Sequence, residues 1–258
     1  MLDHISLFII SLIANAFSAF AGGGAGLLQL PALIFFGIPF SAALATHKVA
    51  SVALGVGATL RHFREHSLQR YYIYSVLLAG VPGVILGAHI VLFIPDRHAE
   101  VALGIMTMAL GIYSIFKPQL GQTYAPRRLD TRQTLLGGIV LFIIGILNGS
   151  LTSGTGLFVT LWLVHWYGLD YRRAVAHTLV LVGLFWNGSG ALTLGLYGNI
   201  QWVWLPVLLL GSLLGGYIGA HFSIIKGNRW IKRAYEFVTI VVGISLIIGR
   251  DNFLLQTP

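Results

Sequence analysis

Residues 4–36, HISLFIISLIANAFSAFAGGGAGLLQLPALIFF, decide the fold class of this chain. The stretch is apolar along almost its whole length, and Gly22, Gly23 and Gly24 break it near the middle. About a dozen apolar residues follow the break, fewer than the ~20 that a membrane-spanning helix needs. Irregular backbone within a bilayer is tolerated only where protein buries it or where it lines a cavity. The stretch therefore predicts two short helices that meet at a glycine-rich tip inside a membrane.

The composition of the whole chain also indicates a membrane protein. Of its 258 residues, 56% are hydrophobic and 9% are charged, against about 25% charged residues in a typical soluble domain. The mean hydropathy is +0.83. These values argue against a water-soluble enzyme, a nucleic-acid-binding protein and a disordered scaffold. Further membrane-spanning helices are predicted at the long apolar runs 41–60, 71–94, 99–116, 174–197, 202–225 and 234–249.

The second half of the sequence resembles the first. Residues 134–167 form another long apolar stretch, which glycines interrupt within the segment Gly154-Thr155-Gly156. The tripeptide Gly-Ala-His occurs at residues 87–89 and again at residues 219–221, in corresponding positions of the two halves. Leu44-Ala45-Thr46-His47 likewise aligns with Val175-Ala176-His177-Thr178. Several matching blocks in the same order predict an internal duplication.

Lys and Arg are concentrated in alternate gaps between the apolar runs. In the first half the rich gaps are residues 61–70 and 117–133, and in the second half they are residues 168–173 and 226–233. The alternation changes phase between the halves, so corresponding gaps lie on opposite sides of the membrane under the positive-inside rule. The net charge of +8 is thus interpreted as a topology signal, and no nucleic-acid partner is expected.

We therefore predict an all-α polytopic membrane protein with two inverted-topology repeats. Each repeat would consist of a glycine-broken helical hairpin plus three transmembrane helices. The repeats occupy residues 1–116 and 134–258, a cytoplasmic linker occupies residues 117–133, and both termini are predicted to be periplasmic. Cleavage of a signal peptide is not expected, because the first residues carry Asp3 and no Lys or Arg.

Broken helices within inverted repeats are typical of transporters. The start of the second short helix in each hairpin would point its partial positive charge at the tip, which favours an anionic substrate. The alternative is that the glycines only permit close helix packing. Lys48 lies within a predicted span, and the run 41–60 contains no acidic residue. An anionic ligand would compensate its charge, or its side chain reaches outward to the helix end.

Polar residues near the two glycine breaks are the candidate substrate-binding residues. Each of them alone could instead form a hydrogen bond between helices. His89 and His221, which occupy corresponding positions in the two halves, either carry protons or pack at the membrane interface. The candidate set is Gly22, Gly23, Gly24, Thr46, His47, Lys48, Asn148, Ser153, Gly154, Thr155, His177, Thr178 and Asn187.

Residues 22–48, GGGAGLLQLPALIFFGIPFSAALATHK, resemble the first half-signature of the TauE/SafE sulfite-exporter family. The resemblance rests on the glycine triplet, Pro31, Gly37 and the Ala45-Thr46 pair, and it extends over essentially the whole chain. In the second copy, Thr160 stands where a counterpart of Pro31 would be expected. The resemblance implies an inner-membrane exporter of sulfite or a small organosulfonate. The tip at Gly22–Gly24 and the segment Thr46–Lys48 would carry the family's function.

The sequence thus predicts a secondary transporter that exports a small sulfur-containing anion, such as sulfite or sulfoacetate, by alternating access. No enzymatic activity, cofactor or metal centre is expected, and the chain has no Walker-type nucleotide-binding motif. The lipid bilayer is the expected partner, and a homodimer is left open. The alternatives are a divalent-metal exporter, suggested by nine histidines, and a membrane scaffold without transport.

Overall fold

The protein is a bundle of α-helices. A computed structural model describes residues 2–62, 68–90, 96–151, 154–197 and 200–248, and this part of the chain contains no strand. A π-helical segment, η3, joins α8 to α9. The elements are α1 (Leu2–Ala21), α2 (Gly26–Phe35), α3 (Phe40–His62), α4 (Arg70–Ile90), α5 (Asp96–Ile115), α6 (Thr131–Ser150), α7 (Thr155–His165), α8 (Tyr171–Val180), η3 (Leu181–Trp186), α9 (Asn187–Tyr197), α10 (Leu205–Lys226) and α11 (Asn228–Ile248).

Six helices of the described chain are long and apolar enough to cross a membrane. They are α1, α3, α4, α6, α10 and the continuous helix formed by α8, η3 and α9. The predicted all-α polytopic fold is therefore confirmed. The predicted runs at 99–116 and 234–249 fall on helices α5 and α11, which are not among these six. Their crossing of the membrane stays a prediction.

The first helix of each broken hairpin differs from the prediction. Helices α1 and α6 have 20 residues each, so each can span a bilayer by itself, whereas α2 has 10 residues and α7 has 11. The prediction of two short helices is therefore wrong for the first helix and confirmed for the second. The reason is the position of the break, because an unbroken apolar run of about 20 residues before it is enough for a full crossing.

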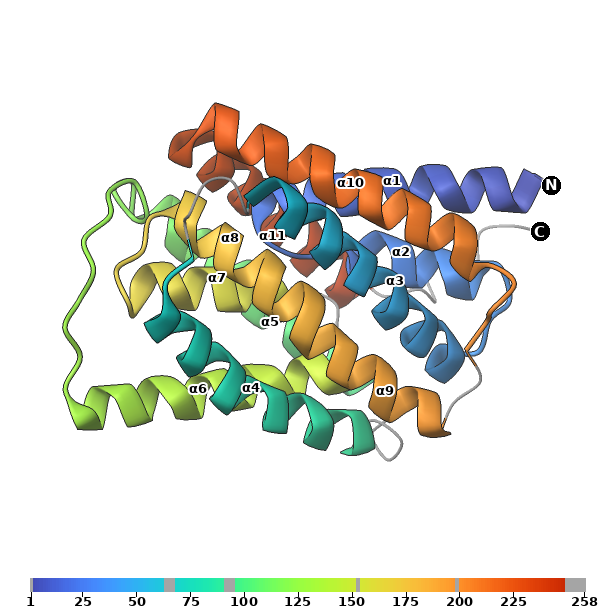
Figure 1. Ribbon diagram of the computed structural model, residues 1–258, viewed down its shortest axis with the longest axis horizontal. Helices are drawn as coiled ribbons and strands as arrows, with labels where there is room; N and C mark the ends of the chain where they lie inside the picture. Colours follow the sequence, from blue (N-terminus) through green and yellow to red (C-terminus); the bar gives the residue numbers. More distant parts are fainter. Residues whose placement is uncertain (1, 63–67, 91–95, 152–153, 198–199, 249–258) are drawn as a thin grey trace.

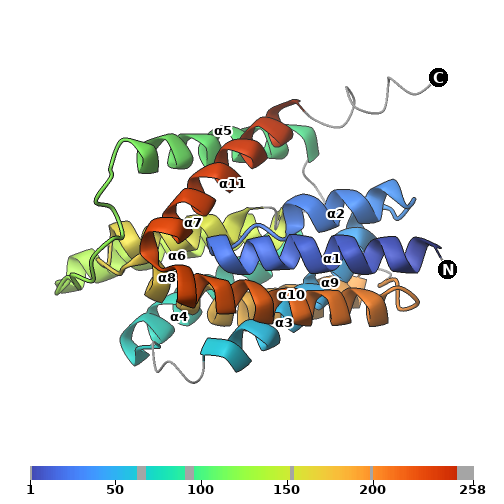
Figure 2. The same ribbon diagram turned by 90° about the horizontal axis from the view of Figure 1, so that it is seen from above.

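The two hairpins enter the molecule from opposite ends. Helix α1 begins at one end of the molecule and α6 at the other (Figures 1 and 2). Helix α2 turns back toward the end where α1 begins, and α7 turns back toward the start of α6 (Figure 2). Each half then continues through three further helices and ends opposite to where it started. An inverted repeat requires this arrangement, while the orientation in the membrane stays a prediction.

The two halves of the sequence interlock rather than forming separate bodies. Helix α1 packs against α10 of the second half, and α6 packs against α4 of the first half. Helices α5 and α11 pack against each other across one face of the bundle (Figure 2). Equivalent glycines make the two interfaces alike. A Cβ atom on Gly87 of α4 would lie 2.1 Å from the Ile146 carbonyl oxygen, and one on Gly219 of α10 would lie 2.1 Å from the Ala16 oxygen. This correspondence supports the predicted duplication.

Replacing Gly219 by alanine is expected to destabilise the fold, because α10 must then move away from the backbone of α1. Overpacking of this kind costs ~1–3 kcal/mol. Gly138→Ala on α6 is the matched control, since the nearest atom to its new Cβ would be the Ala79 Cβ at 3.8 Å. That control should be neutral or stabilising, because alanine favours a helix over glycine by ~1 kcal/mol. Thermal unfolding in detergent measures the stability of both variants. A Gly219→Ala protein as stable as the wild type would contradict the close packing of α10 on α1.

Candidate functional site: a buried polar cavity between the two hairpin tips

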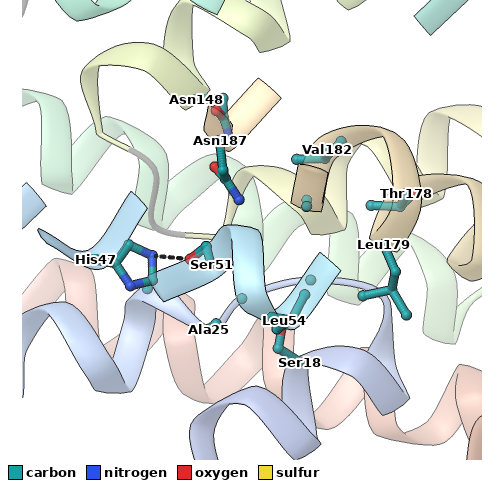
Figure 3. A pocket seen from close by; sticks show the side chains of 15 residues that line it. Ser18, Ala25, His47, Ser51, Leu54, Asn148, Thr178, Leu179, Val182 and Asn187 are labelled. Atoms are coloured by element: carbon teal, nitrogen blue, oxygen red, sulfur yellow. Dashed lines mark hydrogen bonds between the residues drawn. The ribbon is translucent and has the colours of Figure 1, made fainter. Parts of the chain in front are cut away.

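A small cavity of about 40 Å³ lies where the two hairpin tips meet in the interior of the bundle (Figure 3). Its walls come from the end of α1, the starts of α2 and α7, the middle of α3, the ends of α6 and α8, η3 and the start of α9. The lining residues are Ser18, Gly23, Gly24, Ala25, Gly26, His47, Ser51, Leu54, Asn148, Gly156, Thr178, Leu179, Val182, Gly183 and Asn187.

The first tip requires glycine at three successive positions. Gly22, Gly23 and Gly24 have φ angles of 92°, 140° and 104°, in a region that residues with a side chain rarely adopt. The two tips also touch each other. A Cβ atom on Gly23 would lie 2.6 Å from the carbonyl carbon of Gly156, so only glycine allows this approach. The glycine breaks therefore bring the two re-entrant segments into direct backbone contact.

Both short helices begin at the cavity without a side-chain cap. Helix α2 follows Ala25, helix α7 follows Gly154, and neither preceding residue caps the first turn with its side chain. The first backbone N–H groups of a helix have no partner within the helix, and they carry the positive end of the helix dipole. Gly24, Ala25 and Gly156 line the cavity, so both helix starts border it. Two such starts form a natural anion-binding environment.

Hydroxyl and amide side chains complete the cavity wall. Ser18 and Asn148 lie near the ends of α1 and α6, and Ser51 and Thr178 lie on α3 and α8. Among the described lining residues there is no carboxylate, and the only imidazole is that of His47. The wall thus presents neutral hydrogen-bond donors without a negative charge.

Lys48 is fully buried beside this site rather than reaching outward. Its ammonium donates to the Asn148 carbonyl oxygen at 2.8 Å, and its Nζ lies 3.2 Å from the Asn148 side-chain oxygen. The Asn148 carbonyl belongs to the last turn of α6, where carbonyl oxygens lack helical partners and the helix dipole is negative. The outward-reaching alternative is therefore wrong. Lys48 reaches the cavity through Asn148, whose amide nitrogen donates to Thr155 Oγ1 at 2.8 Å at the start of α7.

The π-helical segment η3 determines which side chain of the continuous helix α8–η3–α9 faces the cavity. A π-helical turn contains one residue more than an α-helical turn. Val182 lines the cavity, and the next lining polar residue is Asn187 rather than Trp186. Trp186 instead turns toward α4, where its ring nitrogen donates to the Val76 carbonyl at 3.1 Å. π-Helical segments occur frequently at functional sites for this reason.

In this position the side-chain oxygen of Asn187 lacks a hydrogen-bond partner. The residue is only 9% exposed, and its side-chain oxygen is buried without a hydrogen-bond partner. Figure 3 shows its amide nitrogen directed toward the space between Ser51 and Val182. A buried side-chain oxygen without a partner costs ~1–3 kcal/mol. An anion cannot donate a hydrogen to this oxygen, so an anion in the cavity would bind at the amide nitrogen of Asn187 instead.

The structure places six of the thirteen predicted residues at the cavity wall. Gly23, Gly24, His47, Asn148, Thr178 and Asn187 line it. Gly22, Lys48, Gly154 and Thr155 lie directly behind these residues, at the tips or at Asn148. Ser153 lies outside the described residues.

Thr46 and His177 are not brought to the cavity. The Thr46 hydroxyl donates to the Ala42 carbonyl and accepts the backbone N–H of Gln201. His177 Nε2 accepts the backbone N–H of Gln69, and its Nδ1 lies 2.8 Å from the Arg173 carbonyl oxygen. The geometry gives both side chains structural hydrogen bonds, and it does not support their predicted role in substrate binding.

The candidate set lacked several polar residues of this region. Ser18 and Ser51 line the cavity, and Gln29 contacts His47 from α2. Thr160 of α7 donates to the Gly22 carbonyl at 2.7 Å and lies 2.9 Å from Thr178 Oγ1. A signal for two of these was present in the sequence, because Gln29 precedes His47 by the same 18 residues by which Thr160 precedes Thr178.

A membrane-spanning helix bundle with two re-entrant hairpins that meet at a buried polar cavity has the construction of a secondary transporter. Comparison with known proteins agrees with this class. The family model described as "Sulfite exporter TauE/SafE" matches residues 7–246. The chain therefore belongs to the TauE/SafE family and is a multi-pass membrane transporter.

Individual relatives match over nearly their full length. A probable membrane transporter protein of Haemophilus influenzae is 31% identical over 247 residues, which cover 96% of this chain and 95% of that protein. The probable membrane transporter protein ORF9 of a Sinorhizobium species is 29% identical, with 93% and 91% covered. The probable membrane transporter protein YfcA of Escherichia coli is 28% identical, with 93% and 88% covered.

Gly23→Ala is expected to separate the two tips and to abolish ligand binding, because the new Cβ would collide with the backbone of Gly156. Gly37→Ala is the matched control, since Gly37 also has a positive φ of 85° but has nothing within 4 Å of its added Cβ. That control should lose some stability through backbone strain and should still bind ligand. Equilibrium binding to the purified variants measures the difference, and equal affinity in both would refute a functional tip contact.

Proposed function

We propose that the protein exports a small sulfur-containing anion, sulfite or an organosulfonate such as sulfoacetate, across the inner membrane by alternating access. The observation that carries the proposal is the cavity between the hairpin tips. Two uncapped helix starts and several hydroxyl and amide groups surround it, and no carboxylate is among its described lining residues. Such a site attracts an anion and repels a cation.

The size of the cavity favours a compact headgroup. A volume of about 40 Å³ is room for about three water molecules, at 10–15 Å³ for each. Sulfite or the sulfonate end of a larger molecule suits such a space, whereas a nucleotide does not. The rest of an organosulfonate would extend beyond the enclosed part. The family description as a sulfite exporter supports both the substrate class and the direction of transport.

The arrangement of the hairpins supports alternating access. The two hairpins enter from opposite ends of the molecule (Figures 1 and 2). Their tips touch at Gly23 and Gly156, so the cavity lies at the junction of the two halves. Moving one hairpin or the other away from this junction would open the cavity toward one side of the membrane at a time. The known inverted-repeat transporters place their substrate sites at such junctions.

No observation favours the alternative of divalent-metal export. Within the described residues, no group of three His, Asp or Glu side chains is placed to hold a metal ion. Divalent transition metals prefer several imidazole or carboxylate ligands, and the cavity offers one imidazole. A scaffold without a transported ligand does not account for a polar cavity between the two hairpin tips.

The proposal predicts selective anion binding that depends on Asn187. Sulfite, methanesulfonate and sulfoacetate should raise the melting temperature of the purified protein, whereas phosphate and cobalt ions should not. A ligand at about 100 times its dissociation constant stabilises a protein by ~2.7 kcal/mol. Asn187→Leu should weaken sulfite binding by ~10–100-fold, because a hydrogen bond to a charged group contributes ~1.5–3 kcal/mol.

Ser189→Ala provides the control for this variant. Ser189 lies on the same helix, is partly exposed, and donates its hydroxyl proton to the Phe185 carbonyl, outside the cavity. The affinity of the Ser189→Ala variant for sulfite should equal that of the wild type. Stabilisation by cobalt alone would contradict the proposal in favour of metal export. Efflux of labelled sulfite from proteoliposomes tests the transport step, and efflux equal to that of empty vesicles would refute it.

A further inference from the structure

His47 is the only titratable side chain among the described residues that line the cavity. Its ring is held at both nitrogens. Nδ1 lies 2.7 Å from the side-chain oxygen of Gln29 on α2, and Nε2 lies 3.1 Å from Ser51 Oγ one helical turn further along α3 (Figure 3). Ser51 itself lines the cavity. The imidazole therefore lines the cavity itself and is also hydrogen-bonded to a second lining residue, Ser51.

The hydrogen-bond network behind Gln29 fixes the proton positions on this ring. Ser11 Oγ donates its only proton to the Leu208 carbonyl oxygen at 2.9 Å, because a carbonyl can only accept. Ser11 Oγ then accepts from the Gln29 amide nitrogen, also at 2.9 Å. The oxygen of Gln29 therefore faces His47, and Nδ1 carries the hydrogen. In the neutral ring, Nε2 is left as the acceptor of the Ser51 hydroxyl proton.

While His47 is neutral, this arrangement makes the Ser51 hydroxyl an unfavourable contact for an anion. With its proton committed to His47, Ser51 presents only lone pairs to the cavity. Addition of a proton to Nε2 reverses this bond, since Nε2–H then donates to Ser51 Oγ. The proton of Ser51 becomes free to donate to an anion in the cavity. Rotation of one hydroxyl group is sufficient, and no helix has to move.

The side chains named here around His47 carry no negative charge that could balance a protonated imidazole in place of the anion. The helices α1, α2 and α10 present the uncharged side chains of Ser11, Asn15, Gln29 and Ser212 to this network. Helix α6 contributes Asn148, and α8 contributes Thr178. The neighbouring charge is Lys48, whose ammonium is directed at the Asn148 carbonyl. A protonated His47 would add a second buried positive charge, which an anion in the cavity would compensate.

We propose that the transported anion binds together with one proton, which His47 takes up at Nε2, and that Ser51 relays this change to the anion. The inference rests on the proposed function and specifies the ionic species at that site. It is confined to the first half of the chain, because His47 and Ser51 both lie on α3. The equivalent pair in the second half, Thr160 and Thr178, is separated by the same 18 residues and has no titratable group.

The test uses methanesulfonate, because this anion does not itself change protonation near neutral pH. Calorimetric titration of the purified protein in buffers of different ionisation enthalpy measures protons taken up per anion bound. The wild type should take up a substantial fraction of one proton. Its affinity should fall as pH rises, by up to about tenfold per pH unit, as linkage to one proton requires. His47→Gln should show neither effect.

His89→Gln is the matched control, because His89 is exposed on α4 and is not among the residues that line the cavity. It should retain the full proton uptake. Wild-type binding without proton uptake and without pH dependence would overturn the inference and leave the proposed function intact. Uptake that persists in His47→Gln and disappears in Lys48→Met would assign the proton to Lys48 instead. Failure of the wild type to bind any sulfur anion would overturn the proposed function, and this inference with it.

Discussion

The backbone contact between Gly23 and Gly156 is the constraint on which the rest of the structure depends. It brings the two hairpin tips together in the interior, and any side chain at Gly23 would push them apart. The contact also sets where α2 and α7 begin, so both helix starts border one cavity. The chemical character of the site follows from this geometry, because helix starts supply unpaired N–H groups and positive dipole ends.

Such a tip contact places irregular backbone and polar side chains deep in an apolar bundle, and the surrounding helices must compensate. The interlocked halves provide the rigid frame, with α1 packed on α10 and α6 packed on α4 through close glycine contacts. Within this frame, the buried Lys48 ammonium caps the carbonyl end of α6. His47 joins the cavity to the buried polar network of Gln29 and Ser11. The two helix starts that border the cavity have no side-chain cap from their N-cap residues, Ala25 and Gly154.

The sequence was sufficient to predict the fold class and the position of the tips. It was not sufficient to predict which polar side chains meet at the cavity. Hydropathy located α3, α4, α10 and the helix α8–η3–α9 as spans, and the glycines located the breaks. Thr46, His47 and Lys48 are consecutive, and successive helical residues point about 100° apart, so they cannot all face one cavity. Packing alone decides that His47 does. The π-helical turn of η3 moves Asn187 rather than Trp186 to the wall, and no local pattern revealed it. The partners Gln29 and Ser51 become evident only when α2 packs beside α3.

Locating a bound anion tests the central claim most directly. Selenite is a close chemical analogue of sulfite, and the anomalous scattering of selenium marks its position in a crystal. The account predicts a single strong peak in the cavity, within hydrogen-bonding distance of the backbone N–H groups at Gly24 or Ala25 and of the Asn187 amide. A peak only at the basic segment of residues 117–133, with the cavity free of selenium at saturating selenite, would contradict the account.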